Sequence, residues 1–544
     1  MNFSYFYPPE TFPVAAFIDI LQMKKHADLL FVALMLAVSF LYGYHDILFT
    51  RPGYHHIWRQ SDCLSITMNY YQDNRNFFRP AINWVGDKGG RTISEFPLIY
   101  FTVAQIWKIF GFHEFIFRLI DVLIVFTGLF CLFRLARDFL SDTFWALFIP
   151  LFLFSSPILG YFTNNFLADA PALGLVLIAC YFYRKACTLQ NNRWYYLSFL
   201  IFLLAGLLKI SSLLVFIALF LIQCYCIVFS RGEKTWYNRV SRLWPYLGVL
   251  LLIIAWYSYA GSYNKANLNG IFLHGILPVW GIDSAARLEI WSKLFKVLLP
   301  EFFTIPALLL VMAIFISLFV FYRKINRFFL FLSLLVFLGC IGFMLLFFQV
   351  FNVHDYYLIN LLIFIPLPVI AFLDLLKRHY PSLFNSVFLK VTAAMGLAIL
   401  LYIGAVNTRM RYYPRQDFVQ KSILVNKENI SQWIGWSDYC GTYFNAFKTI
   451  TPYLRSLGIK RNDLVYSTPD GTINVTLYLM DQKGFSDFYI GDIPEDKRIE
   501  TVKSLGVRYL IINDTTICRK PFLLPYLKHK VGSYLNVEIF DLNL

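Results

Sequence analysis

The chain has 544 residues, of which 58% are hydrophobic, 19% aromatic and only 15% charged. An ordinary soluble protein carries about 25% charged residues, so this composition excludes a soluble enzyme and indicates an integral membrane protein. The formal net charge of +15 does not indicate nucleic-acid binding, because the basic residues form short clusters between apolar segments and build no basic face.

The N-terminal segment, residues 1–28, carries Lys24 and Lys25 directly before the first long apolar run. Lysine and arginine favour the cytoplasmic side of a membrane, so the N-terminus is predicted to be cytoplasmic. No small-residue cleavage pattern follows the run, which is therefore expected to remain as an anchor. The first span then delivers the following loop to the outer face.

That loop, Tyr54–Pro97, is long, polar and aromatic in a chain that is otherwise mostly apolar. Loops of this length are uncommon unless they are functional. It carries a carboxylate at each end, Asp62 and Glu95. The apolar stretch 98–112 that follows has only about 15 residues, too few to cross about 30 Å of hydrocarbon, so it is predicted to lie at the membrane interface.

With 98–112 on the outer face, about eleven transmembrane helices are predicted, within a membrane domain over residues 29–407 that has outer loops at 49–114 and 261–301. Every strongly basic short loop then falls on the cytoplasmic side, as the positive-inside rule requires. The expected spans are 29–48, 115–135, 143–160, 166–183, 195–208, 212–229, 243–260, 302–322, 328–350, 356–376 and 388–406. The basic clusters are Arg134 and Arg137; Arg184 and Lys185; Arg231, Lys234, Arg239 and Arg242; Arg323, Lys324 and Arg327; and Lys377 and Arg378.

Residues 408–544 are polar and are predicted to form a small extracytoplasmic α/β domain. Leu464–Ser467, Arg508–Ile512 and Val537–Phe540 have the composition of strands, and Pro494–Leu505 that of a helix ended by Gly506. No catalytic motif is evident here, so a structural or acceptor-docking role is favoured.

The cysteines outline neither a metal site nor a disulfide framework. Most of the nine lie in apolar runs, where cysteine packs as a small hydrophobic residue. Cys440 and Cys518 lie outside these runs, and a disulfide between them is the less favoured alternative.

Asp169 lies at the mouth of an apolar helix, two residues before Pro171. An ionisable residue in this position is a functional candidate by default, although a helix N-cap with proline in the first turn is an equal alternative. More polar side chains lie at outer ends of spans, and each has a structural alternative as a compensating ion pair, a snorkelling lysine or an interfacial tyrosine. They are Arg118, Asp121, Lys209, His354, Tyr356 and Tyr357.

In order and type these features resemble the GT-C superfamily of membrane glycosyltransferases, in the branch of the protein O-mannosyltransferases and the lipid A aminoarabinose transferase. The resemblance covers about residues 25–410. Its elements are Asp62; Pro97-Leu98-Ile99-Tyr100; Arg118; Ser156-Pro157; Asp169 with Pro171; Gly206, Leu207 and Lys209; and His354 with Tyr356 and Tyr357. It implies a GT-C-like fold, a sugar donor on polyprenyl phosphate, and Asp62 and Asp169 at the catalytic centre.

The chain departs from the aminoarabinose branch at Glu95 and Phe96, where that branch has a phosphate-binding lysine and a second proline. This difference argues against the aminoarabinose enzyme itself. Either another cation meets the donor phosphate, or Glu95 holds a metal. The candidates for donor and phosphate binding are Arg59, Lys88, Arg91, Glu95, Arg118, Lys209, Arg287, His354, Tyr356 and Tyr357.

The resemblance implies an inverting transferase in a bacterial inner membrane, with the donor and a glycan, lipid or protein acceptor as partners on the periplasmic or extracellular face. A lipid phosphate is a good leaving group, so positive charge and one general base suffice. Asp62 is predicted to be the base or to orient the acceptor. Asp169 shares that role or, with Asp62 and Glu95, binds Mg²⁺ or Mn²⁺.

A transporter or flippase of lipid-linked sugar is the alternative. Such proteins place polar sites near the bilayer midplane, within repeated halves. The charges here lie at the outer ends of spans and no repeat is evident, which favours the transferase.

Overall fold

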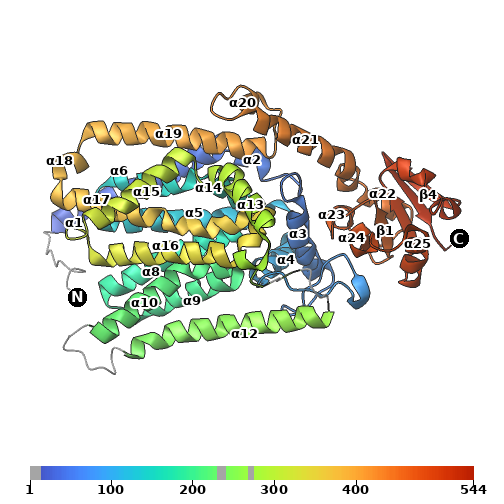
Figure 1. Cartoon of the computed structure of the whole chain (residues 1–544), viewed down its shortest axis with the longest axis horizontal. Helices are drawn as coiled ribbons and strands as arrows, with labels where there is room; N and C mark the ends of the chain where they lie inside the picture. Colours follow the sequence, from blue (N-terminus) through green and yellow to red (C-terminus); the bar gives the residue numbers. More distant parts are fainter. Residues whose placement is uncertain (1–13, 230–239, 268–271, 273–274, 544) are drawn as a thin grey trace. The chain divides into compact units, whose positions relative to one another are not determined.

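The computed structural model describes residues 14–229, 240–267, 272 and 275–543 (Figure 1). The first 13 residues of the predicted cytoplasmic segment and the basic residues Arg231, Lys234 and Arg239 lie outside this range. The chain divides into two compact units. Unit 1 comprises Met1–Leu48, Arg118–Tyr257 and Gly275–Arg409, and unit 2 comprises Phe49–Phe117, Ser258–His274 and Met410–Leu544. The predicted first outer loop therefore shares a unit with the C-terminal segment, and the predicted domain boundaries stay a prediction.

Unit 1 is helical, and its long helices run side by side in Figure 1. Three of them, α5, α12 and α19, include residues of unit 2. The helices are α1 (Val14–Leu41), α2 (Tyr44–Ile47), α5 (Phe115–Leu140), α6 (Thr143–Phe154), α7 (Pro157–Thr163), α8 (Asp169–Leu189), α9 (Asn192–Leu208), η3 (Ile210–Leu213), α10 (Leu214–Phe229), η4 (Ser241–Leu243), α12 (Trp244–Asn267), η5 (Val279–Gly281), α13 (Ser284–Lys293), η6 (Leu294–Leu298), α14 (Leu299–Phe302), α15 (Ile305–Val320), α16 (Arg327–Leu346), η7 (Phe348–Asn352), η8 (Asp355–Phe364), α17 (Pro366–His379), α18 (Pro381–Phe384) and α19 (Val387–Met410).

Among the described residues, seven helical segments are long and apolar enough to cross a membrane, or up to nine if each of two bent pairs forms one span. The bent pairs are α6 with α7, at 79°, and Ser284–Phe302 with α15, at 88°. The predicted fold class of a polytopic helical membrane protein is confirmed. The count is lower than the eleven spans expected, and the two other expected spans coincide with α1 and with α9, which has 17 residues.

Burial separates the central helices of unit 1 from the peripheral ones. The span Asp355–His379 is 89% buried, whereas the span Val387–Met410 is only 6% buried. The large exposed side chains of the second span are apolar and include Val387 and Phe388. Such a surface would be unfavourable in water and suits contact with lipid chains.

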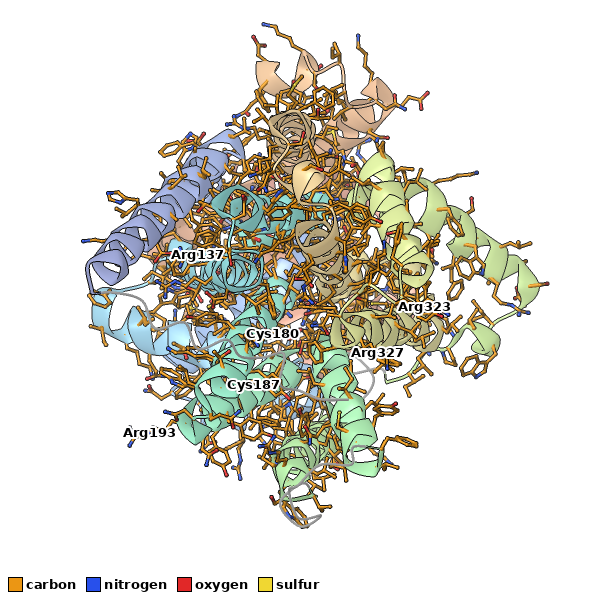
Figure 2. The ribbon with its side chains drawn as sticks, turned by 90° about the vertical axis from the view of Figure 1, so that its left-hand side faces the viewer. Arg137, Cys180, Cys187, Arg193, Arg323 and Arg327 are labelled. Atoms are coloured by element: carbon orange, nitrogen blue, oxygen red, sulfur yellow. The ribbon has the colours of Figure 1, made fainter. Side chains whose placement is uncertain are left out.

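Basic residues gather at one end of unit 1. Figure 2 shows Arg137, Arg193, Arg323 and Arg327 on the end that faces the viewer. Arg137 lies near the end of α5 and Arg193 near the start of α9, while Arg323 lies in the connection from α15 to α16 and Arg327 begins α16. At this end Nη1 of Arg137 donates to a carboxylate oxygen of Asp28 at 2.9 Å. The predicted clustering of positive charge at the span ends is therefore present in the folded chain.

Unit 2 combines the helices of the first outer loop with a small α/β assembly. The elements are α3 (Ile57–Gln72), η2 (Gly86–Lys88), α4 (Leu98–Phe110), α20 (Asp417–Gln420), α21 (Lys427–Phe444), η9 (Ala446–Lys448), α22 (Thr451–Ser456), β1 (Val465–Thr468), α23 (Val475–Leu479), β2 (Gly484–Ser486), α24 (Asp487–Ile490), α25 (Glu495–Ser504), β3 (Tyr509–Ile512), η10 (Thr515–Arg519), η11 (Leu524–Tyr526), β4 (Lys530–Tyr534) and β5 (Val537–Asp541). Helix α4 has 13 residues, too few for a span, as predicted for 98–112.

The five strands form one sheet in the order β2-β1-β3-β5-β4. Strand β1 pairs in parallel with β2 and β3, and β5 pairs antiparallel with β3 and β4. The predicted strands coincide with β1, β3 and β5, and the predicted helix with α25, so these predictions are confirmed. Gly506 follows α25 with a φ of 89°, the left-handed conformation expected of a terminating glycine. All nine cysteines are free, including Cys440 and Cys518, so the disulfide alternative is wrong.

Candidate active site

Asp62 lies on the buried face of α3. Its side chain is 5% exposed, and its Oδ1 accepts a hydrogen bond of 2.8 Å from Nδ2 of Asn474. Burial raises the pKa of Asp62 to about 6, against the opposing effects of the Arg59 charge and the Asn474 hydrogen bond. The negative charge of Glu95 adds to the increase. A carboxylate with this pKa is ionised at neutral pH and is basic enough to take a proton.

Glu95 is the partner of Arg59. Nη2 of Arg59 forms an ion pair with Oε1 of Glu95 and also donates to the hydroxyl of Ser94. Oε2 of Glu95 accepts a hydrogen bond from the Tyr100 hydroxyl at 2.7 Å. The Glu95 side chain is 6% exposed, so the carboxylate is enclosed by hydrogen-bond donors. Of the two roles predicted for Glu95, this geometry favours holding an arginine over binding a metal.

Asp169 is the first residue of α8, and the residue that caps this helix is Ala168. The N-cap alternative for Asp169 is therefore wrong. Its Oδ2 instead lies 3.2 Å from Nζ of Lys209, the residue that ends α9. The Lys209 ammonium also lies 5.6 Å from the ring centroid of Tyr356 and 5.7 Å from that of Tyr357, within the range of cation–π attraction.

Arg118 supports the turn that leads into α8. Its side chain is fully buried, and Nη1 donates to the main-chain oxygen of Asn164. Its guanidinium carbon lies 4.0 Å from the ring centroid of Phe166. Asp121 interacts electrostatically with both Arg118 and Asp169, which joins these charges into one cluster.

The structure thus brings the predicted residues together in two groups. The group in unit 2 contains Asp62, Arg59 and Glu95; the group in unit 1 contains Asp169, Lys209, Arg118, Tyr356, Tyr357 and His354, whose ring lies 5.1 Å from that of Tyr356. The remaining three candidates, Lys88, Arg91 and Arg287, belong to neither group. Lys88 and Arg91 are exposed on the loop, and Nε of Arg287 donates to the main chain of its own helix at Asp283.

Sequence reasoning missed Asn474, Ser94 and Tyr100 as members of the site. Tyr100 belongs to the Pro-Leu-x-Tyr element, but the sequence did not predict its hydrogen bond to Glu95. Asn474 lies 412 residues from Asp62, and no local pattern connects the two.

The metal prediction was made for Asp62, Glu95 and Asp169. Among the described residues, no group of three histidine, cysteine or acidic side chains with ligand atoms within 4.8 Å of one another includes any of these carboxylates. The divalent cation therefore stays a prediction.

The membrane helices and the small α/β assembly form the fold that the resemblance in the sequence implies, and the comparisons with known proteins agree with this fold. Residues 94–259 match the family model described as dolichyl-phosphate-mannose-protein mannosyltransferase. The structure is similar to that of ArnT from Cupriavidus metallidurans bound to undecaprenyl phosphate, with a TM-score of 0.57, and to the apo state of ArnT, with a TM-score of 0.54.

Both similarities cover 94% of this chain and 97% of the ArnT chain, at 14% sequence identity, and they concern the fold. No curated protein is similar to the chain in sequence at a significant level.

Proposed function

We propose that this protein transfers a sugar from a polyprenyl phosphate to an acceptor hydroxyl, with inversion at the anomeric carbon. The observation that carries the proposal is the state of Asp62, a buried carboxylate with a pKa raised to about 6. A general base works best when its pKa lies near the operating pH. Together with a fold shared over nearly the whole chain with ArnT, this favours a transferase over a transporter.

The proposed reaction needs one proton transfer and one displacement. Asp62 takes the proton of the acceptor hydroxyl while the acceptor oxygen bonds to the anomeric carbon. The bond from that carbon to the phosphate oxygen breaks at the same time, and the phosphate leaves with the electron pair. Because attack and departure occur on opposite faces of the sugar, one carboxylate base is sufficient.

The leaving phosphate requires positive charge, since its oxygen gains electrons as the bond breaks. Lys209 is the favoured cation, because Asp169 holds its ammonium group beside the two tyrosine rings. Arg59 is the second choice, and Glu95 fixes its position. The undecaprenyl phosphate bound to ArnT supports a donor of this class.

We infer that the protein lies in a bacterial inner membrane and acts on its outer face. The basic end of unit 1 would face the cytoplasm, in accord with the positive-inside rule. The proposed acceptor is a glycan, a lipid or a protein of the cell envelope.

The proposal is tested by comparing cells with and without the gene. Mass spectrometry of envelope glycans, lipids and glycoproteins is expected to show one sugar that disappears with the gene and returns with the wild-type copy. A copy carrying Asp62→Asn should be made and inserted but should fail to restore the sugar. Full restoration by this variant would contradict the proposed base.

A second measurement addresses the donor directly. Purified protein in lipid nanodiscs is supplied with the lipid-linked sugar fraction of the same cells as the donor and with envelope material from cells that lack the gene as the acceptor. It is expected to release undecaprenyl phosphate. Movement of that fraction across the bilayer of proteoliposomes without release of undecaprenyl phosphate would instead indicate a flippase.

A further inference from the structure

Asn474 lies in the connection that leaves the carboxyl end of β1, directly before α23. Internal hydrogen bonds fix this connection. The Asp470 carboxylate accepts from the main-chain N–H groups of Thr472, at 2.9 Å, and Thr476, at 3.2 Å. The carboxylate of Asp487, which follows β2, in turn accepts from the main-chain N–H of Asp470 at 2.8 Å. The position of Asn474 is therefore determined by the sheet and not by a loose loop.

Both polar atoms of the Asn474 side-chain amide form hydrogen bonds. Its Nδ2 donates to Oδ1 of Asp62 at 2.8 Å, and its Oδ1 accepts from the main-chain N–H of Trp84 at 3.0 Å. The residue is 1% exposed. Because the main-chain N–H of Trp84 can only donate, the amide oxygen must face Trp84 and the amide nitrogen must face the carboxylate. The orientation of the amide is thus set by its partners.

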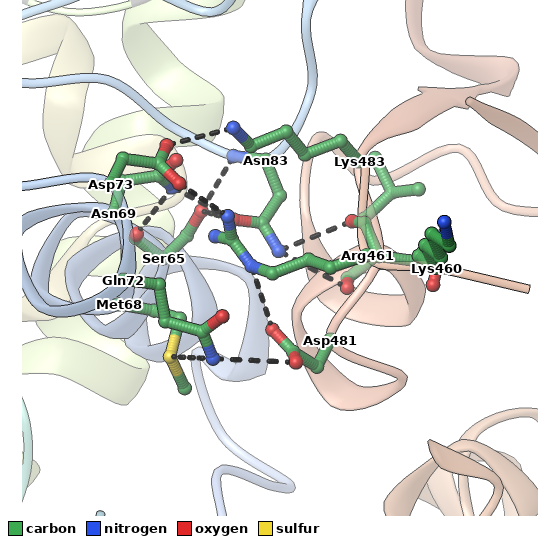
Figure 3. A network of polar contacts seen from close by, with 12 residues as sticks. Ser65, Met68, Asn69, Gln72, Asp73, Asn83, Lys460, Arg461, Asp481 and Lys483 are labelled. Carbon is green, nitrogen blue, oxygen red and sulfur yellow. Dashed lines mark hydrogen bonds and ion pairs between the residues drawn. The ribbon is translucent and has the colours of Figure 1, made fainter. Parts of the chain in front are cut away.

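Other contacts hold α3, the helix that carries Asp62, against the C-terminal segment. Figure 3 shows Asp73, just past the end of α3, with Arg461 and Lys483, each at 2.7 Å. Asn83 donates from Nδ2 to the main-chain oxygens of Leu477 and Gln482, both at 3.2 Å. Helix α3 therefore stays attached to the C-terminal segment without Asn474, so the Asn474 contact can be removed by itself.

We propose that Asn474 is a positioning residue of the active site, through which the C-terminal segment orients the Asp62 carboxylate toward the acceptor hydroxyl. The inference rests on the proposed function and adds to it a role for the C-terminal segment. With Oδ1 held by Asn474, Oδ2 is the oxygen that takes the proton. The charged and titratable groups that act on Asp62 are Arg59, Glu95 and Cys63.

The hydrogen bond from Asn474 to Asp62 is expected to affect the pKa of Asp62, which a contact with a purely structural role would not do. A hydrogen bond donated to a carboxylate favours its ionised form, so its loss raises the pKa of the acid. A difference of about 1 kcal/mol between the hydrogen bonds to the ionised and protonated carboxyl corresponds to about 0.7 pH unit. In Asn474→Ala the acidic limb of the pH–rate profile is expected to move upward by about half a unit to one unit.

Asn474→Asp separates the two functions of the side chain. An aspartate can still accept from the main-chain N–H of Trp84, but it places a second carboxylate against Asp62. Like charges at this distance raise the pKa of one member of the pair strongly. The Asp variant is therefore expected to be less active at neutral pH than the Ala variant, although it is closer in shape to the native residue.

The experiment compares wild type, Asn474→Ala, Asn474→Asp and the matched control Asn83→Ala, all as full-length protein in nanodiscs. Release of undecaprenyl phosphate from the lipid-linked sugar fraction is measured across pH, with envelope material from cells that lack the gene as the acceptor. The infrared band of the protonated Asp62 carboxyl is titrated in parallel and assigned by its absence in Asp62→Asn. The control removes the hydrogen bonds of Asn83 to the C-terminal segment and to Ser65 and Asn69 of α3, but none to Asp62. It should therefore lower heat stability and leave the acidic limb of the pH–rate profile in place.

An upward shift of the limb and of the infrared titration in both Asn474 variants, but not in the control, supports the inference. Unchanged profiles in both variants would overturn it while leaving the proposed transfer intact. A wild type that releases no undecaprenyl phosphate would refute the proposed function, and the infrared titration alone would then decide whether Asn474 controls Asp62.

Discussion

Lys209 and Asp169 form a buried ion pair at the ends of two helices, with Nζ of the lysine 3.2 Å from Oδ2 of the aspartate. The side chains are 15% and 2% exposed. Charges removed from water in this way persist only when they are paired, and removing one partner leaves the other uncompensated. The pair therefore fixes an ammonium group at the place where unit 1 offers the best candidate for binding a phosphate.

Asp169→Asn and Lys209→Gln are expected to be non-additive. Each single variant leaves one buried charge and should lose stability, by about 3 kcal/mol for a fully buried pair and less here because Lys209 is partly exposed. The double variant should recover much of that stability. Transfer should fall by about 10²-fold or more in all three, because the ammonium is absent or misplaced. Thermal unfolding and undecaprenyl phosphate release measure the two effects separately.

The matched control for this pair is Asp142→Asn. Asp142 forms a comparable ion pair with Lys390, at 2.6 Å and with 16% and 23% exposure, and lies outside both site groups. The asparagine retains a side-chain oxygen that can cap α6, as Asp142 does. This variant should lose stability but keep transfer. Equal losses of transfer in Asp142→Asn and Asp169→Asn would show that the effect of Asp169 is only structural.

The parts of the fold that sequence reasoning predicted are those with a local cause. Strands β1 and β3 are buried throughout and begin with or consist of β-branched, aromatic and aliphatic residues, and α25 is followed by a glycine in the left-handed conformation. Strand β4 was missed because Lys530–Tyr534 is polar and largely exposed, and β2 because it has three residues.

The same distinction applies to the site. Asp62 and Glu95 attracted attention as the ends of a long polar loop, and Asp169 as an ionisable residue at the mouth of an apolar helix; the catalytic role of Asp62 and Asp169 came from the resemblance. Their partners were not all predictable, since a pair such as Asp62 and Asn474 depends on tertiary packing across 412 residues. The interpretation of Asp169 as an N-cap was reasonable from spacing, but the ion pair with Lys209 took its place.

The pH dependence of transfer is expected to follow Asp62. Burial raises its pKa to about 6, so the base is ionised above that pH and protonated below it. The rate should fall about tenfold per pH unit below about pH 6, and Asp62→Asn should lose about 10²–10⁴-fold in rate. A flat profile between pH 5 and about pH 7 would contradict the assignment.

The same shift predicts a gain in stability for Asp62→Asn. An acid whose pKa is raised on folding stabilises the folded state only at low pH. That contribution is lost as the pH rises from the ordinary value of 3.8 through about 6. At pH 7 the buried carboxylate is charged and opposes folding, so the asparagine variant should unfold at a higher temperature than wild type. Below about pH 4 the difference should disappear.

Two cysteines that form no disulfide allow the orientation of the chain to be tested. Cys518 is partly exposed in the C-terminal segment, and Cys187 is partly exposed at the basic end of unit 1, where Figure 2 shows it. In single-cysteine variants a membrane-impermeant maleimide is expected to label Cys518 in intact spheroplasts and Cys187 only after permeabilisation. The reverse pattern would place the C-terminal segment in the cytoplasm and exclude catalysis on the outer face.

Two measurements decide the role of Glu95: the effect on transfer of removing its charge, and the effect on transfer of removing divalent cations. Its carboxylate is engaged by Arg59 and Tyr100, so chelation of divalent cations is expected to leave transfer unchanged. Glu95→Gln removes the charge that holds Arg59 and should weaken donor binding. Loss of a charge-assisted hydrogen bond of about 1.5–3 kcal/mol corresponds to a rise of roughly 10- to 150-fold in the KM for the donor.

Tyr100→Phe is the control, because it removes one neutral donor to Glu95 but keeps the ion pair with Arg59. Its effect on the KM should be smaller than that of Glu95→Gln. Glu95→Lys should nearly abolish transfer, since it sets two positive charges against each other beside Asp62. If transfer instead stops on chelation and returns only with added Mg²⁺ or Mn²⁺, Glu95 is a metal ligand, and the assignment to Arg59 is wrong.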